Sequence, residues 1–224
     1  MTDHLIDLSH TVSHGLVTYE GLPAPVITTH LSREASRPHY SDGTEFHIGR
    51  IDMVANTGTY LDAPFHRYES GADLSELPLT RLADLTGRVV RHEADRALTE
   101  GALFAAFGSD LAGLPGCAVL IRTGWSRHWN TPAYFREAPF VTRAAATLLA
   151  DAGVALVGID SFNIDDVGDR SRPAHSILLA AGIPIVEHLC GLDALPEGPF
   201  RFFAVPVKVK DFGTFPVRAF AITP

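Results

Sequence analysis

The stretch NTGTYLDAPFHRY, residues 56–68, contains residue types that can hold a metal ion or transfer a proton. Asp62 and His66 stand four positions apart on either side of Pro64, whose ring stiffens the chain between them. Gly58 permits a backbone conformation that other residues resist. A Gly/Pro turn whose Asp and His form only local hydrogen bonds would show the same pattern. The local pattern therefore leaves both a functional site and a simple turn open.

A second group of polar side chains follows an apolar run. The segment GIDSFNIDD places Asp160, Ser161 and Asn163 at the end of a predicted strand. Open α/β sheets bind ligands beyond the carboxyl ends of their strands, so these side chains are candidates for a site. For Asp165 and Asp166 we favour a capping role in a polar loop.

His175 and Glu187 complete the set of candidates. His175 lies near the start of a predicted short helix, and Glu187 interrupts the apolar run IPIVEHL. Burying a lone carboxylate in a core strand is costly unless it is paired or bound to a metal. Glu187 is therefore a candidate ligand. His188 should point to the opposite face, as a surface or hydrogen-bonded core histidine.

These candidates lie at the ends of predicted strands and helices. Apolar and alternating runs predict strands at 5–12, at the end of the Pro- and Gly-rich segment 14–32, and at 47–58, 87–94, 117–124, 154–160, 183–189, 201–209 and 215–222. Helical spacing predicts helices at 98–111, 140–153 and 173–182. The alternation of strand and helix in the second half implies parallel pairing. We therefore predict an α/β fold with more strand than helix, a central βαβ unit and an additional mixed or antiparallel sheet.

The composition is that of a globular protein. The chain has 224 residues without a linker or repeat, which favours one domain over residues 1–224. A net charge of −8 argues against a nucleic-acid partner, and no apolar run has membrane-spanning length. The first ten residues lack an apolar signal segment. Cys117 and Cys190 form no CxxC pattern, which favours a reducing cytoplasm.

Together these segments resemble the cyclase family of metal-dependent hydrolases, which includes bacterial kynurenine formamidases and isatin hydrolases. The family motif His-x-Gly-Thr-His-x-Asp-x-Pro-x-His corresponds to residues 56–66, with Asn56 and Tyr60 in place of the first two histidines. The similarity continues through GIDSFNIDD and PAHSILLAAGIPIVEHL, and so spans nearly the whole chain. It implies the family's strand-rich, swivelling β/β/α-like fold. It also implies a homodimer or homotetramer, because the family tends to form them.

The resemblance also implies a ligand set. In the two-zinc members, one metal is held by the first two histidines of the motif, the aspartate and a late glutamate. The aspartate, a helix-start histidine and the same glutamate hold the other. Carried over by position, Asp62, His175 and Glu187 remain as ligands and suit one Zn²⁺ or Mn²⁺ with an open position. His66 corresponds to the proton donor and acceptor. In the family, the two missing histidines bind only one of the two metals. The pattern therefore indicates a half-dismantled dinuclear site, in which one metal position has lost its own ligands and the other keeps them.

The expected function is hydrolysis of an amide, formamide or lactam C–N bond in a small aromatic or cyclic molecule. At most one divalent ion would take part, and the site could also have lost metal altogether. Tyr19, Asn56 and Tyr60 are the expected substrate-binding residues, and Tyr19 could equally be a surface tyrosine. Two alternatives stay open: a metal-independent cyclase, dehydratase or isomerase that uses His66, and an inactive small-molecule binder.

Overall fold

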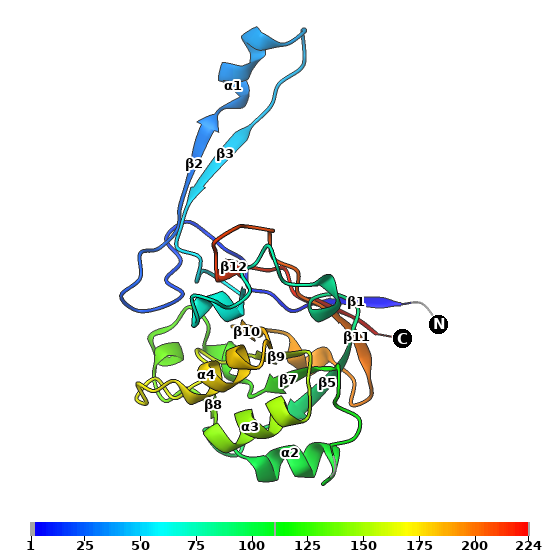
Figure 1. Ribbon diagram of the computed structural model, residues 1–224. Coiled ribbons are helices and arrows are strands. Elements are labelled where there is room, and N and C mark those ends of the chain that lie inside the picture. Colours follow the sequence, from blue (N-terminus) through cyan, green and yellow to red (C-terminus); the bar gives the residue numbers. More distant parts are fainter. Residues whose placement is uncertain (1–2, 110, 224) are drawn as a thin grey trace.

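A curled mixed sheet forms the body of the computed structural model, which describes residues 3–109 and 111–223 (Figure 1). Its nine strands pair in the order β1 (His4–Asp7), β13 (Phe220–Thr223), β11 (Phe200–Phe203), β5 (Leu85–Arg91), β7 (Ala118–Arg122), β9 (Leu156–Ile159), β10 (Ile185–Glu187), β4 (Tyr60–Asp62) and β12 (Thr214–Pro216). The four central strands β5, β7, β9 and β10 run parallel, and the flanking strands pair antiparallel. The predicted strand-rich α/β fold is confirmed.

Helices connect the parallel strands, as the alternation in the sequence predicted. The helix α3 (Arg143–Asp151) lies between β7 and β9 in the chain, and α4 (Pro173–Ala180) lies between β9 and β10. Thr142 starts α3 by accepting a hydrogen bond from the backbone N–H of Ala145. Gly153 follows the helix with φ 68°, where a side chain would be strained. The central βαβ unit is therefore specified by local signals.

The remaining elements are short. They are the helices α1 (Arg33–Ser36) and α2 (Glu100–Phe107), the paired strands β6 (Ala97–Leu98) and β8 (Phe140–Val141), and the 3-10 turns η1 (Arg37–His39), η2 (Pro64–His66), η3 (Leu79–Arg81), η4 (Trp125–His128), η5 (Pro132–Phe135) and η6 (Leu192–Ala194). Among the described residues, none of the helices has the length and apolar character needed to cross a bilayer.

The sheet separates two apolar layers. Val119 and Ile121 of β7 lie in the layer that includes Leu149 of α3, on the side of the sheet covered by α2, α3 and α4 (Figure 1). Leu120, between them, lies in the other layer with Leu61 of β4. Successive side chains of a strand point to opposite faces, so a strand buried on both faces is apolar throughout. This explains the continuous apolar run CAVLI, residues 117–121.

Three predictions about the strands were wrong. The strand predicted at 47–58 ends at Asp52, so it does not run into the motif. The strand predicted at 215–222 is broken into β12 and β13, which lie toward opposite edges of the sheet. The antiparallel strands mostly extend the parallel ones instead of forming a separate large sheet. Local alternation shows that a segment is extended, but not which neighbour it pairs with.

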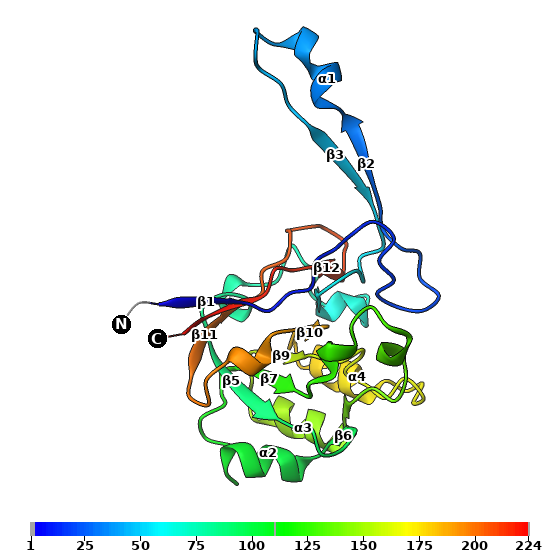
Figure 2. The ribbon, with the colours of Figure 1, turned by 180° about the vertical axis from the view of Figure 1, so that it is seen from behind.

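One hairpin leaves the body entirely. Within the described part of the chain, the strands β2 (Val26–Leu31) and β3 (Ile48–Asp52) pair only with each other, and α1 lies in the connection between them. Figures 1 and 2 show this hairpin projecting far from the curled sheet, with α1 near its tip. We call residues 26–52 the arm. The sequence predicted its strands but gave no sign that they would stand apart.

Candidate metal and catalytic site

Two neighbouring strands bring the carboxylates of the site together. The strands β4 and β10 pair antiparallel with Tyr60 opposite Glu187 and Asp62 opposite Ile185. Tyr60 and Asp62 are two positions apart, so their side chains share one face of the sheet. His66 follows on the turn η2, where Pro64 occupies the first position, as the stiffening role of that proline predicted.

His175 enters from the first turn of α4 and completes the group. Its Nε2 atom lies 3.6 Å from Oδ2 of Asp62 and 3.6 Å from Oε1 of Glu187. Ligand atoms bound to a tetrahedral zinc are themselves about 3.4 Å apart, because each bond is about 2.0–2.2 Å. Oδ2 of Asp62 is buried and has no hydrogen-bond partner among the described residues. These three side chains therefore fit a divalent ion.

Asp165 orients His175 toward this point. Its Oδ2 lies 2.6 Å from Nδ1 of His175. The same carboxylate accepts hydrogen bonds from the backbone N–H groups of Ala174 and His175, so the predicted capping role is confirmed. In the neutral ring that binds a metal, Nδ1 donates to Asp165 and Nε2 keeps its lone pair for the site. Carboxylates often hold metal-binding histidines in this way. The sequence did not reveal this second role, which depends on the loop folding back onto α4.

Thr214 connects Asp62 to His66. Its hydroxyl donates to Oδ1 of Asp62 and lies 2.9 Å from Nδ1 of His66. The hydroxyl has one proton, so its oxygen accepts from Nδ1–H of His66. Nε2 of a neutral His66 is then unprotonated. Thr214 lies on β12, far away in the sequence, and the sequence analysis missed it.

Tyr60 stands where the family motif has a histidine, and its hydroxyl faces a carboxylate. It donates a hydrogen bond of 2.7 Å to Oε2 of Glu187. Burial, followed by the charges of Glu187 and Asp62, raises the pKa of Tyr60 well above its usual value, against an opposing hydrogen bond from Asn56. The phenol of Tyr60 thus stays protonated, and its proton is donated in the hydrogen bond to Glu187.

Burial and mutual contacts shift the other pKa values of the site. Burial raises the pKa of Glu187 to about 7, although His175 opposes the shift. Burial disfavours a charged His175, but Asp165 and Asp62 outweigh it and raise the pKa of His175 to about 10. Burial also acts against ionisation of Asp62, yet His175 and His66 lower its pKa overall. A positive charge between the two carboxylates is therefore favourable.

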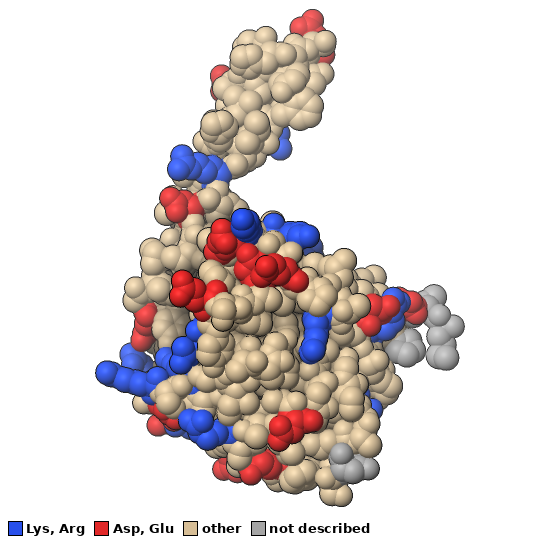
Figure 3. Space-filling view, in the orientation of Figure 1, with Lys and Arg blue, Asp and Glu red and all other residues tan. Residues whose placement is uncertain are grey.

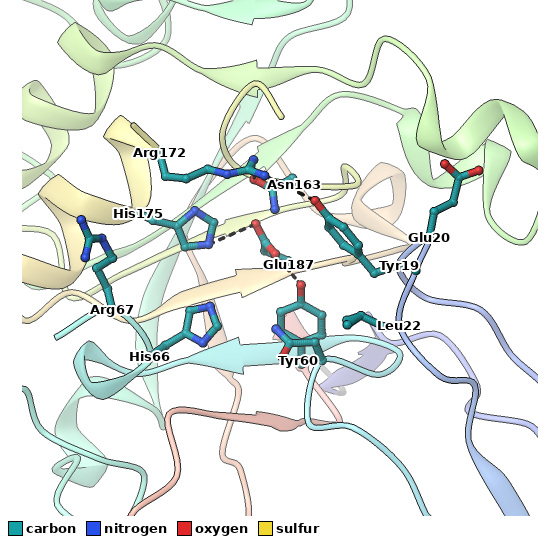
Figure 4. A pocket seen from close by; sticks show the side chains of 12 residues that line it. Tyr19, Glu20, Leu22, Tyr60, His66, Arg67, Asn163, Arg172, His175 and Glu187 are labelled. Carbon is teal, nitrogen blue, oxygen red and sulfur yellow. Dashed lines mark hydrogen bonds and ion pairs between the residues drawn. The ribbon is translucent and has the colours of Figure 1, made fainter. Parts of the chain in front are cut away.

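A cavity of about 460 Å³ opens above these side chains (Figure 4). The predicted residues Tyr19, Asn56 and Tyr60 line it, together with His66, His175, Glu187 and Asn163. The other lining residues carried no signal in the sequence, and they are Glu20, Gly21, Leu22, Arg67 and Arg172. The volume lies within the range of small-molecule sites, about 300–1,000 Å³.

The wall formed by Tyr19 is aromatic on one side and polar on the other. The rings of Tyr19 and Phe162 are 4.6 Å apart. The guanidinium of Arg172 reaches the Tyr19 hydroxyl at 3.5 Å and Oδ1 of Asn163 at 3.4 Å, both long for hydrogen bonds. Arg172 therefore keeps donors for a bound molecule. Figure 4 shows its side chain extending along the cavity above His175.

Other polar candidates have structural roles. Asp160 accepts hydrogen bonds from the backbone N–H groups of Thr123 and Gly124, and Ser161 donates to the Pro139 carbonyl. His188 is fully buried, with its Nδ1 atom 2.9 Å from the Tyr134 hydroxyl. Of the two placements that the sequence left open for His188, surface or core, the structure shows the core one.

Comparison with known proteins identifies the family. Residues 6–166 match the family model Cyclase, described as a putative cyclase. A kynurenine formamidase of Paracidovorax citrulli (strain AAC00-1) is 33% identical over 185 residues, covering 79% of this chain and 80% of the relative. The chain therefore belongs to the cyclase family, as its motif residues indicated.

Similar structures cover the whole chain. One, described as a potential metal-dependent hydrolase with cyclase activity, has a TM-score of 0.80 and 27% identity, and the match covers 100% of this chain and 99% of that one. Isatin hydrolase A from Labrenzia aggregata has a TM-score of 0.84 at 21% identity, covering 99% of this chain and 94% of that one. The second similarity is one of fold. The curled sheet is thus a shared family architecture.

Proposed function

We propose that this protein is a metal-dependent hydrolase that cleaves the C–N bond of an amide, formamide or lactam in a small aromatic or cyclic molecule. One observation carries the proposal: Asp62, His175 and Glu187 converge below a cavity, and a buried oxygen of Asp62 has no partner among the described residues. The name kynurenine formamidase, carried by a relative, supports an amide-type bond as the target.

Asp62, His175 and Glu187 would hold one zinc or manganese ion. When bound, the ion would supply Lewis acidity for a carbonyl and lower the pKa of a water molecule. The hydroxyl of Tyr60 already donates to Oε2 of Glu187, so a neutral hydrogen bond takes a position that a second cation would need. This contact supports a single ion.

His66 would transfer the proton. Its side chain is 36% exposed, and the contact with Thr214 leaves Nε2 of the neutral ring free to accept. In our proposal Nε2 takes a proton from the attacking water as its oxygen adds to the carbonyl carbon. The same proton then goes to the nitrogen as the C–N bond breaks, and His66 returns to its neutral form.

A different set of metal ligands, with His66 in place of Glu187, must be distinguished from the set proposed above. Ligand atoms of Asp62, His66 and His175 all lie within 4.8 Å of one another. We favour proton transfer for His66 because it is the exposed member of the group and its Nδ1 is held by Thr214. Glu187 is buried beside His175, as a ligand would be.

The cavity would bind the substrate, and the cell interior is its proposed setting. Tyr19, packed at a tilt against Phe162, offers an aromatic wall, and Asn56 offers an amide beside Tyr60. Cys117 and Cys190 are free thiols. Free thiols are typical of a reducing compartment, so we place the protein in the cytoplasm.

Metal content and turnover test the proposal together. Protein purified without chelator is analysed for bound metals and assayed with the formamide of kynurenine and with a fused-ring lactam. We expect one equivalent of a divalent ion and hydrolysis of at least one substrate. Glu187→Gln should lose both, whereas the matched change Glu20→Gln at the cavity wall should keep the metal. Full hydrolysis by metal-free protein would contradict the proposal and favour metal-independent chemistry.

A double variant tests the number of ions. Asn56→His with Tyr60→His supplies two imidazoles in place of an amide and a neutral phenol, and imidazole is a strong zinc ligand. We expect the variant to bind a second equivalent of zinc in a titration beside wild type. Binding of a second zinc by wild type would contradict the proposal of a half-dismantled site. Failure of the double variant to bind a second zinc would contradict it too.

A further inference from the structure

Arg172 carries a positive charge that no described carboxylate pairs with. Its guanidinium has two long contacts, at 3.5 Å to the Tyr19 hydroxyl and at 3.4 Å to Oδ1 of Asn163. Asp169, three residues earlier, is already used, because it accepts hydrogen bonds from the backbone N–H and the hydroxyl of Ser171. Most of the five N–H donors of the guanidinium are therefore available to a bound molecule.

The backbone at Arg172 is also unusual for an arginine. It precedes α4 with φ 47° and ψ 61°, in the left-handed region that glycine or asparagine adopts more easily. Its side chain does not cap α4, since Asp165 accepts hydrogen bonds from the N–H groups of Ala174 and His175. The stability of α4 thus gives no reason for an arginine here. Residues held in unfavourable conformations often lie at ligand sites, and Arg172 lines the cavity.

Tyr19 adds a second donor at the same point of the wall. Its oxygen accepts from Arg172, so its own proton remains free to donate to a bound molecule. Figure 4 shows this hydroxyl and the end of the Arg172 side chain on one side of the cavity, with His66 on the opposite side and His175 between them. A molecule whose carbonyl group lies beside Nε2 of His175 can therefore extend to both donors.

The other charges of the cavity wall favour an anion as well. Glu20 pairs with Arg136, whose guanidinium lies 3.5 Å from its carboxylate. Arg67 also lines the cavity, with its Nε atom 3.4 Å from the Ser176 hydroxyl, and it forms no ion pair with any described residue. In Figure 3 basic side chains gather on the side of the body that carries the loop before α4. Although the whole chain has a net charge of −8, this wall attracts negative groups.

We propose that Arg172 and the Tyr19 hydroxyl form a subsite for a carboxylate, which the substrate carries at a distance from the bond that is cleaved. A guanidinium donates two parallel hydrogen bonds to a carboxylate, and the phenol can donate a third. These donors satisfy two oxygens that share one negative charge. The carboxylate takes no part in the reaction. It orients the substrate so that the carbonyl group meets Asp62, His175 and Glu187.

The inference rests on the proposed function and narrows its substrate to an anionic molecule. It is tested first by binding, with compounds that contain no C–N bond, so the result does not depend on turnover. The compounds are para-acetylbenzoate and its neutral counterpart para-diacetylbenzene, together with the meta isomers of both. In each pair, a carboxylate is replaced by an uncharged group of similar shape.

Calorimetric titration of the full chain, as purified, measures the affinities. We expect wild type to bind the acid of at least one pair about 10–100-fold more tightly than the neutral compound, as charge-assisted hydrogen bonds allow. Arg172→Gln should abolish this preference without changing the affinity for the neutral compound. The matched control Arg170→Gln removes the same charge from an exposed position of the same loop and should keep the preference. No preference in wild type, or a preference that persists in Arg172→Gln because the acid binds the metal instead, would overturn the subsite.

The part played by the Tyr19 hydroxyl is tested in the same titration. Tyr19→Phe keeps the ring and should weaken binding of the acid about tenfold, with the neutral compound unaffected. An equal loss for both compounds would remove the hydroxyl from the subsite.

Turnover separates this inference from the proposed function. Release of formate is compared for para-formamidobenzoate and para-formamidoacetophenone and for their meta isomers. We expect a higher kcat/KM for the acid in wild type and in Arg170→Gln, and equal values in Arg172→Gln. Hydrolysis without any preference for the acid would overturn the inference and leave the proposed function standing. A preference for the acid in binding without hydrolysis of either compound would support the subsite and count against the proposed function.

Discussion

The arm and the β4 part of the cavity floor are close in the sequence, yet the side chains of the floor and of the arm are held in opposite ways. Asp62 and Glu187 are buried, and their hydrogen bonds come from β12, the loop before α4 and the neighbouring strand. The strands of the arm pair with each other and with no other described strand. One region is fixed by many distant segments, and the other by its own short sequence.

The two regions also lack different partners, and the missing partner follows from the chemistry. At the cavity floor the unsatisfied group is an oxygen of Asp62 beside a second carboxylate, which attracts a cation. On the arm the unsatisfied surface is apolar, with Ile51 55% exposed, and favours another protein surface. A buried polar atom and an exposed apolar side chain are both costly, so each indicates what binds there.

Removing the proton-transfer group should have the largest effect. His66→Ala should lower kcat about 10²–10⁴-fold, the usual contribution of general acid–base catalysis, while the metal content stays at the wild-type level. The matched control is His47→Ala on the arm, which should keep full activity. Loss of metal together with activity in His66→Ala would instead assign His66 to the ligand set with Asp62 and His175.

Disturbing the orientation of His175 should have the next largest effect. Asp165→Asn keeps the shape of the side chain but weakens its hold on Nδ1, so we expect metal affinity to fall about 10–100-fold. The neighbouring change Asp166→Asn, at a partly exposed position, should leave the affinity unchanged. Competition with a coloured chelator measures both. Equal affinities would show that Asp165 only caps α4.

Breaking the link between Asp62 and His66 should have a smaller effect. Thr214→Val removes the hydroxyl but keeps the branched shape, and we expect kcat to fall about tenfold, the equivalent of one hydrogen bond. Thr214→Ser should restore most of the rate because it restores the hydroxyl. Steady-state kinetics with a metal determination decide it, and an unchanged rate in the valine variant would remove Thr214 from proton transfer.

Shortening an arm side chain should change the stability of the body least. Ile27→Ala should change the free energy of unfolding by about 0.5 kcal/mol or less, as exposed sites do. Leu120→Ala in the core should lower it by about 2–5 kcal/mol. Urea unfolding measures both. A large loss in the arm variant would mean that the arm belongs to the core of its own chain.

The sequence by itself determined the parallel unit and the principal side chains of the site. Thr142 marks the start of α3, and Gly153 marks its end. Both act through residues within one or two helical turns, so the signal of each is local. Asp62, His66, His175 and Glu187 were found because their order and spacing follow a family motif. Signals of these two kinds can be recognised in a single sequence, because they depend on neighbouring residues or on a spacing shared with the family.

Only the tertiary structure decided how these side chains are used. Thr214 reaches Asp62 across 152 positions, and Tyr60 reaches Glu187 across 127. Such contacts arise when strands distant in the chain become neighbours in the sheet, and local alternation carries no record of that pairing. The same holds for the arm. Its alternating residues predict strands, but whether a strand joins the body or stands apart depends on which surfaces remain to cover it.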